Sequence, residues 1–419
     1  MKGKTLLFIV FLSVFLVSYL ICTFFGYTTV WKLWHIPVMM PTFADTRAIT
    51  SGSEASALGY DPLFNNVRDP WHRPMNLSRL WNVLFYFRLN QSHTNLLATI
   101  FISSFFLSPF IFIKKLDKLT ACVLSCAFIS PAIMLGVERG TPDLFLFFIL
   151  ATAIRVGYVS IIAALCLIVF AGFLKLFPIF GIGLILKEKI SQFWILLSIT
   201  CISFLSYLVF TFSDVKQMIR VTPKGTDFSY GYDVFILASK NYFKNSSYLP
   251  LLKIALPIFS YFLLLSILVI AILLVFKNPV HDEDENEIEK NKYIDAFRVG
   301  AGIYIGTFLF GHNWDYRLMF LIFTIPQIVT WIKQKNSRYF LAASFTLPTI
   351  ILSFWYLILA RIINYYLTFN LGLIIDEFFN WVVFSGLVYL FLASLPNWLC
   401  NIMYKLVLAV RQRWQILVG

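Results

Sequence analysis

The sequence predicts an all-α protein with roughly a dozen transmembrane helices, and its composition and apolar runs lead to this fold class. Hydrophobic residues make up 59% of the chain, whereas charged residues make up 13%, about half of their share in soluble domains. Long apolar runs alternate with short polar segments. A helix satisfies its own backbone hydrogen bonds, as lipid requires, so the chain is expected to be a single polytopic membrane domain over residues 1–419.

Twelve segments are apolar enough to be considered as spans. In chain order their approximate cores are residues 5–26, 93–113, 119–137, 142–154, 157–174, 177–187, 193–212, 251–276, 297–311, 317–332, 339–360 and 377–398. The fourth and sixth are short, so either is expected to be re-entrant or broken. No small-x-small cleavage site ends the first run, which predicts a retained span rather than a signal peptide.

The loop charges predict the orientation of the spans. Basic clusters precede the first span and recur in alternate loops at 114–118, 187–189, 290–298 and 333–338. The positive-inside rule places these loops and both termini in the cytoplasm, together with an acidic linker at 277–296. Two large loops, 27–92 and 213–250, then face the extracytoplasmic side. Because the net charge of +13 is spread over these clusters, no nucleic-acid partner is expected.

The first outer loop is expected to begin with a short helix. Thr42 followed by Asp45 predicts a capping box, with the helix running to about Ala57 and ending at Gly59. Asp45 then has two interpretations. It is either a helix cap, or a general base that takes a proton from an acceptor hydroxyl.

The rest of the first loop is rich in proline and aromatic residues. Several prolines interrupt Tyr60–Trp81, so no long helix is expected there, and an interfacial anchor or a lid over a site fits better. Its candidate substrate contacts are Trp71, His72 and Arg73. Two further carboxylates of the loop remain alternatives to Asp45 as the base, namely Asp61 and Asp69.

Two outer turns carry charges beside the membrane, where charges are costly and indicate function. Glu138, Arg139 and Asp143 lie between the third and fourth spans. Either Glu138 and Arg139 pair with neighbours, or Arg139 binds phosphate while Glu138 or Asp143 binds sugar hydroxyls or orients the cations. Lys175 lies in the next outer turn, against the positive-inside bias, and a lipid phosphate in the outer leaflet would explain it.

A third polar cluster covers Gly311–Arg317. Arg317 can form a bidentate pair with phosphate, and Asp315 is expected to orient it or simply to pair with it. Trp314 is expected to stack on an isoprenoid or a sugar ring. The loop 213–250 is expected to meet an acceptor through its tyrosines, Tyr230, Tyr232, Tyr242 and Tyr248.

The sequence contains no P-loop, Rossmann or nucleophile-elbow pattern, and its cytoplasmic loops are too short for a nucleotide-binding domain. A donor substrate therefore has to come from the membrane, which favours a lipid-linked donor. No Asp/His cluster on the outer side calls for a metal, so no cofactor and a metal-independent reaction are expected.

These segments together resemble the GT-C superfamily of integral membrane glycosyltransferases, nearest to the polyprenol-phosphate-mannose-dependent mannosyltransferases of family 87. The resemblance rests on Asp45 in Phe-Ala-Asp and on the segments Glu138–Asp143, Leu174–Pro178 and Asn313–Arg317. It implies a hexosyltransferase of the inner (plasma) membrane with its active site facing the periplasm or exterior. The sugar, mannose in that family, would move with inversion from a polyprenyl-phosphate donor to a glycan or lipid acceptor. Asp45 would be the base, and Lys175 and Arg317 the phosphate contacts.

Two other classes of membrane protein remain open. A transporter or flippase of lipid-linked saccharides should place charges near the bilayer midplane, whereas here they gather at the outer helix ends. An O-antigen polymerase or ligase also has a large outer loop, but usually late in the chain.

Overall fold

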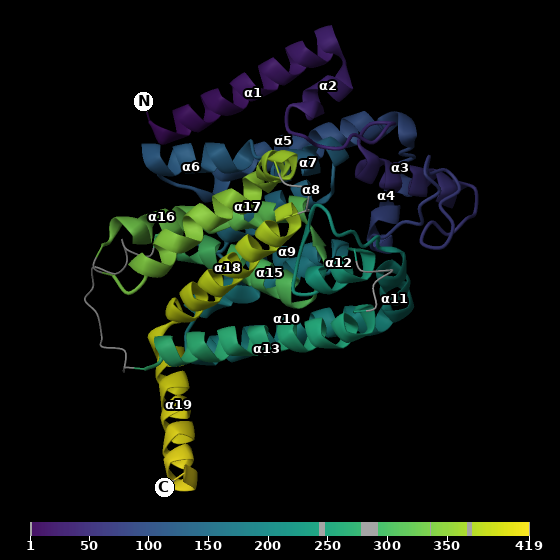
Figure 1. Ribbon diagram of the computed structural model, residues 1–419. Coiled ribbons are helices and arrows are strands. Elements are labelled where there is room, and N and C mark those ends of the chain that lie inside the picture. Colours follow the sequence, from purple (N-terminus) through teal and green to yellow (C-terminus); the bar gives the residue numbers. More distant parts are fainter. Residues whose placement is uncertain (1, 243–247, 278–291, 336, 367–370, 419) are drawn as a thin grey trace.

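The protein is almost entirely helical, and most of its long helices run roughly side by side (Figure 1). The computed structural model describes residues 2–418 apart from 243–247, 278–291, 336 and 367–370. The predicted acidic linker at 277–296 lies mostly outside the described residues. Within the described part of the chain, β-structure is limited to one antiparallel pair, in which β1 (Ser229–Tyr230) lies beside β2 (Asn313–Trp314).

Six helices among the described residues are long and apolar enough to cross a membrane. They are α1 (Gly3–Phe25), α5 (Thr94–Phe112), α10 (Ile190–Phe210), α13 (Leu249–Val275), α17 (Phe340–Tyr366) and α18 (Leu371–Ala393). A seventh span results if α6 (Lys118–Phe128) and α7 (Pro131–Arg139) are counted as one helix bent by 53°. Pro131 opens α7 and cannot continue the hydrogen bonding of α6, which explains the bend.

The prediction of an all-helical membrane fold is thus confirmed, whereas the predicted number of about twelve spans is not. The remaining predicted spans are helical but shorter: α8 (Asp143–Val156), α9 (Ile161–Leu174), η3 (Phe177–Lys187), α15 (Ile294–Leu309) and the pair η4 (Asp315–Phe323) and α16 (Ile325–Lys333). Most of α8 and α15 is buried among other helices. Helix ends that are surrounded by protein find polar partners there, so such helices need not match the bilayer thickness.

The interior of the bundle is closely packed and fixes the loops at its ends. The ring of Phe147 on α8 stacks on Phe323 of η4 with centroids 4.1 Å apart. A Cβ at Gly306 of α15 would come within 2.3 Å of the Phe180 ring, so only glycine allows η3 to approach α15 this closely.

Several short elements gather at one end of the bundle, on the right in Figure 1. They are α2 (Tyr27–Lys32), α3 (Ala44–Ala57), η1 (Arg79–Asn82), α4 (Val83–Tyr86), η2 (Gln91–His93), α11 (Phe212–Val221) and α12 (Val234–Tyr242). The N-terminus and the start of α19 lie at the opposite end. The helix α19 (Asn397–Val418) was not predicted, because the predicted spans end at residue 398.

The start of α3 differs from the prediction in a way that affects Asp45. The helix ends at Ala57 as expected, but no capping box opens it. The N-cap residue is Phe43, in a left-handed conformation with φ of 60°, and no side chain caps the helix. Asp45 is therefore not a helix cap. The prediction that Tyr60–Trp81 contains no long helix is confirmed.

Candidate functional site

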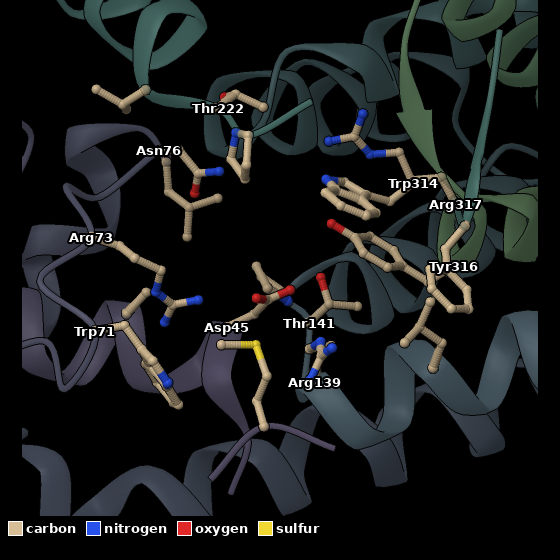
Figure 2. A pocket seen from close by; sticks show the side chains of 18 of the residues that line it. Asp45, Trp71, Arg73, Asn76, Arg139, Thr141, Thr222, Trp314, Tyr316 and Arg317 are labelled. Carbon is tan, nitrogen blue, oxygen red and sulfur yellow. The ribbon is translucent and has the colours of Figure 1, made fainter. Parts of the chain in front are cut away.

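A cavity of about 550 Å³ opens at the end of the bundle where the short elements gather. The first loop, the α7–α8 turn, the segment after α9, the loop after α11 and the β2–η4 segment all contribute to its wall. Eight of the predicted residues line it: Asp45, Trp71, His72, Arg73, Arg139, Lys175, Trp314 and Arg317. Figure 2 shows the labelled side chains around one open space. The other three, Glu138, Asp143 and Asp315, lie buried behind the wall.

Asp45 lies in the first turn of α3 and borders the cavity. Among the described residues, no group donates a hydrogen bond to its carboxylate. Burial raises the pKa of Asp45, and the positive charges of Arg73, Arg139 and Lys175 oppose that rise. The carboxylate is thus free to contact a bound molecule. Its raised pKa also makes it a stronger base than an ordinary aspartate, as general-base catalysis requires.

The two alternative carboxylates of the first loop are engaged elsewhere. Asp61 lies 2.7 Å from the Arg79 guanidinium, at the protein surface. Asp69 has a fully buried side chain, which accepts hydrogen bonds from the Trp71 and Arg73 backbone and from the Arg73 guanidinium at 3.0 Å. Neither carboxylate lines the cavity. Asp45 is therefore the one of the three that can reach a bound molecule.

The turn between α7 and α8 presents a cation to the cavity. Arg139 Nη1 lies 2.6 Å from Glu138 Oε2, and the Met39 backbone N–H donates to Glu138 Oε1 at 2.9 Å. The Glu138 side chain is fully buried, whereas 15% of the Arg139 side chain remains exposed. Glu138 thus fixes Arg139 and does not itself reach a ligand.

A buried carboxylate also joins the two cations predicted to bind phosphate. Lys175 Nζ lies 2.5 Å from Asp143 Oδ1, and Arg317 Nε lies 3.3 Å from Asp143 Oδ2. Arg317 Nη1 also donates to Asn313 Oδ1 at 2.7 Å. The side chains of Lys175 and Arg317 are each 15% exposed, and that of Asp143 is fully buried.

The prediction that Asp315 orients Arg317 is wrong, because Asp143 holds that position. Asp315 is buried, and its Oδ1 has no hydrogen-bond partner among the described residues. The error has a simple cause. Asp315 is near Arg317 in sequence, whereas Asp143 reaches it only because α8 packs beside η4.

The charges of the cavity follow one pattern. Four cations line it, and each is held from behind by a carboxylate with a fully buried side chain. The pairs are Arg73–Asp69, Arg139–Glu138, Lys175–Asp143 and Arg317–Asp143. The paired carboxylates are buried, so a ligand in the cavity meets the cations rather than these anions. Because the ion pairs already hold the cationic side chains in place, little side-chain entropy is lost when a ligand binds. Such a site suits a phosphate group.

Aromatic and apolar groups complete the wall. The Arg73 guanidinium carbon lies 4.5 Å from the centre of the Trp71 ring. A Cβ at Gly225 would come within 3.1 Å of the Trp314 indole, so this glycine lets the loop after α11 pack on the tryptophan. His312 strengthens the same junction by accepting a hydrogen bond from Gly225 N at 3.0 Å, and burial lowers its pKa to about 4.

The second outer loop contributes residues to the cavity that were not predicted from the sequence. Thr222 and Phe228 line it, whereas Tyr230 does not. Tyr230 is buried and stacks on Tyr304 of α15, with centroids 5.2 Å apart. The strand pairing of β1 with β2 produces this arrangement, and two-residue strands leave no pattern in the sequence.

Two buried acidic residues of α18 were also missed. Asp376 and Glu377 are almost completely buried, and both Glu377 carboxylate oxygens and Asp376 Oδ1 have no hydrogen-bond partner among the described residues. They lie close enough to Asp315 to interact with it electrostatically. The predicted span 377–398 begins between these two residues, and no role was predicted for either of them.

The sequence matches no known protein-family model, and no curated protein or solved structure matches it either. Among the described residues, no group of three or more His, Cys, Asp or Glu side chains is arranged to hold a metal ion. The chemistry of the cavity is therefore the basis for a functional proposal.

Proposed function

We propose that the protein is a membrane glycosyltransferase of the GT-C type, similar to the family 87 enzymes. It transfers a hexose, mannose by analogy, from a polyprenyl-phosphate donor to a glycan or lipid acceptor, with inversion. In this proposal about twelve segments enter the membrane, both termini are cytoplasmic, and the cavity opens on the extracytoplasmic side of the inner membrane.

The proposal rests on one observation: a carboxylate and several cations line the same cavity. Asp45, a carboxylate without a hydrogen-bonding partner among the described residues, shares the cavity with Arg139, Lys175 and Arg317. A phosphorylated sugar needs both a cationic site for its phosphate and a base for the incoming hydroxyl. The cavity volume of about 550 Å³ lies within the usual range for ligand pockets.

The proposed reaction is a single displacement. The acceptor hydroxyl oxygen attacks the anomeric carbon while the bond from that carbon to the phosphate oxygen breaks. The hydroxyl proton passes to the Asp45 carboxylate, and the electron pair of the broken bond stays on the polyprenyl phosphate. Lys175 and Arg317, held by Asp143, stabilise the negative charge that develops on this leaving group. Attack opposite to the leaving group inverts the anomeric configuration.

The orientation of the cavity is part of the proposal. The short elements and the cavity lie at the end of the bundle opposite to the N-terminus. The basic residues Lys2 and Lys4 lie at that N-terminus, and the positive-inside rule assigns their side to the cytoplasm. The cavity then faces a compartment where lipid-linked donors, rather than nucleotide sugars, are the expected substrates.

The test is incubation of the purified protein with a panel of polyprenyl-phosphate sugars, with release of free polyprenyl phosphate as the readout. One donor should be consumed, and Asp45→Asn should slow release by about 100-fold or more, the usual contribution of a general base. Asp61→Asn is the matched control, because Asp61 belongs to the same loop but pairs with Arg79 at the surface. No release from any donor, or equal rates for Asp45→Asn and the wild type, would refute the proposal.

A flippase of lipid-linked saccharides is the second candidate, and one observation favours it. Asp376 and Glu377 are buried in α18, and ionisable groups in membrane helices often mark transport pathways. The two functions respond differently to substitution. Asp45→Asn should abolish glycosyl transfer but leave a flippase active, whereas Glu377→Gln should impair lipid translocation in reconstituted vesicles only if the protein is a flippase.

A further inference from the structure

A second pocket, of about 330 Å³, lies towards the other end of α3 from Asp45. Glu54 on α3 lines it, together with Arg68, Phe85 and Arg88 of the first loop. The helical rise of about 1.5 Å per residue puts Glu54 roughly 14 Å along the α3 axis from Asp45. None of the residues that the structure describes lines both pockets, so the second one is a separate feature.

The second pocket carries positive charge that the protein does not neutralise. Arg68 and Arg88 are exposed, and neither has a carboxylate within ion-pair distance in the described part of the chain. The acid of the pocket is already engaged, because Glu54 accepts hydrogen bonds from Gln91 N at 2.8 Å and from Gln91 Nε2 at 3.1 Å. Two arginines and one glutamate leave the pocket with a net positive charge, so an anion can meet the arginines while Glu54 stays bound to Gln91.

Arg88 occupies a position that usually belongs to glycine. It follows α4 with φ of 54°, and the Leu89 backbone N–H closes the helix by donating to Leu84 O at 3.2 Å. A side chain in this left-handed conformation costs free energy that glycine would avoid. Backbone strain of this kind is often found at functional sites, and a ligand-binding role of Arg88 at the rim of the pocket would explain it.

The surface beside Arg88 is apolar. Val83, Tyr86 and Phe87 are 50%, 80% and 71% exposed on the short segment that carries α4. Exposed tyrosine and phenylalanine side chains beside a cation suit the boundary between lipid chains and headgroups, where aromatic residues gather in membrane proteins. A soluble acidic saccharide has no acyl chains that could bind to this apolar surface.

We propose that the second pocket binds the phosphate headgroup of an anionic membrane lipid. Arg68 and Arg88 contact the phosphate, and the exposed side chains of α4 enter the acyl-chain region. The lipid thereby fixes the position of α3, and with it Asp45, at the membrane surface. The inference does not depend on glycosyl transfer.

Native mass spectrometry of the full-length protein in detergent, titrated with phosphatidylglycerol, tests this inference. The double variant Arg68→Gln/Arg88→Gln should bind the lipid about 30-fold more weakly, since each cation contributes about 1 kcal/mol to binding of anionic lipid. The matched control is Lys216→Gln/Lys240→Gln, which removes two exposed cations of the second outer loop, outside the pocket. It should leave the affinity within about threefold of the wild type.

Three results would overturn the inference. The first is unchanged lipid affinity in the arginine double variant, and the second is an equal loss in the lysine control. The third concerns the occupant: displacement of phosphatidylglycerol by a soluble glucuronate-containing oligosaccharide would identify the pocket as a saccharide site. Phosphatidylcholine should bind the wild type more weakly than phosphatidylglycerol does, because its choline cation offsets the charge of its phosphate.

Discussion

Substitution of Asp143 by asparagine separates the two roles of the cavity, folding and anion binding. Asp143 holds Lys175 and Arg317 together from a fully buried position. Asparagine keeps the size of the side chain but removes its charge, so two cations lose their common partner. The variant should be less stable than the wild type, and its cavity should bind phosphate more tightly, because a phosphate can replace the missing carboxylate.

The magnitude follows from burial. Removal of one member of a buried ion pair costs about 3–5 kcal/mol, mainly because the remaining charge has no partner. Lys175 and Arg317 each keep 15% of the side chain exposed to the cavity, so solvent reduces this cost. We expect a loss of about 3 kcal/mol in the free energy of unfolding, at the lower end of that range.

The measurement is thermal unfolding in detergent with and without inorganic phosphate. Asp117→Asn is the control: the Asp117–Lys333 pair is 2.9 Å long with both side chains about half exposed, so its loss should cost at most about 1 kcal/mol. Asparagine also preserves the Asp117 helix cap. Phosphate should raise the melting temperature of Asp143→Asn more than that of the wild type or the control. Equal shifts in all three proteins would refute the reasoning.

Three further predictions concern catalysis. Because burial raises the pKa of Asp45 above its usual value of 3.8, the transfer rate should begin to fall at a pH above that value as the pH is lowered. A rate that stays constant down to pH 3.8 would contradict the assignment of Asp45 as the base. Gly140→Ala should slow transfer about tenfold or more, because the new Cβ would lie 2.6 Å from Thr46 Oγ1 and displace the start of α3. Gly59→Ala is its control, with positive φ but open space, and should have little effect. Transfer should also persist after metal chelation, and a loss that Mg²⁺ or Mn²⁺ restores would contradict the metal-independent mechanism.

The sequence predicted the parts of the fold that depend on local composition. Runs of apolar residues long enough to cross a bilayer identify α1, α5, α10, α13, α17 and most of α18 without reference to the rest of the chain. The same loop assignment placed Asp45, Lys175 and Arg317 on one side of the membrane, and the cavity brings these three residues together.

Features that depend on packing between distant segments could not be predicted in this way. Asp143 was predicted as one of two acids that could orient the cations, but its pairing with Arg317, far away in sequence, was not. The shortening of the inner spans reflects burial by neighbouring helices, which composition does not record. The capping box failed because Phe43 adopts a left-handed conformation, which local sequence preferences did not indicate.

A structure of the protein with a polyprenyl-phosphate sugar bound would test the central claim most directly. The account predicts that the phosphate oxygens lie within hydrogen-bonding distance of Lys175 and Arg317, with the anomeric carbon facing the side of the cavity that holds Asp45. A phosphate located outside this cavity, or a sugar turned away from Asp45, would contradict it.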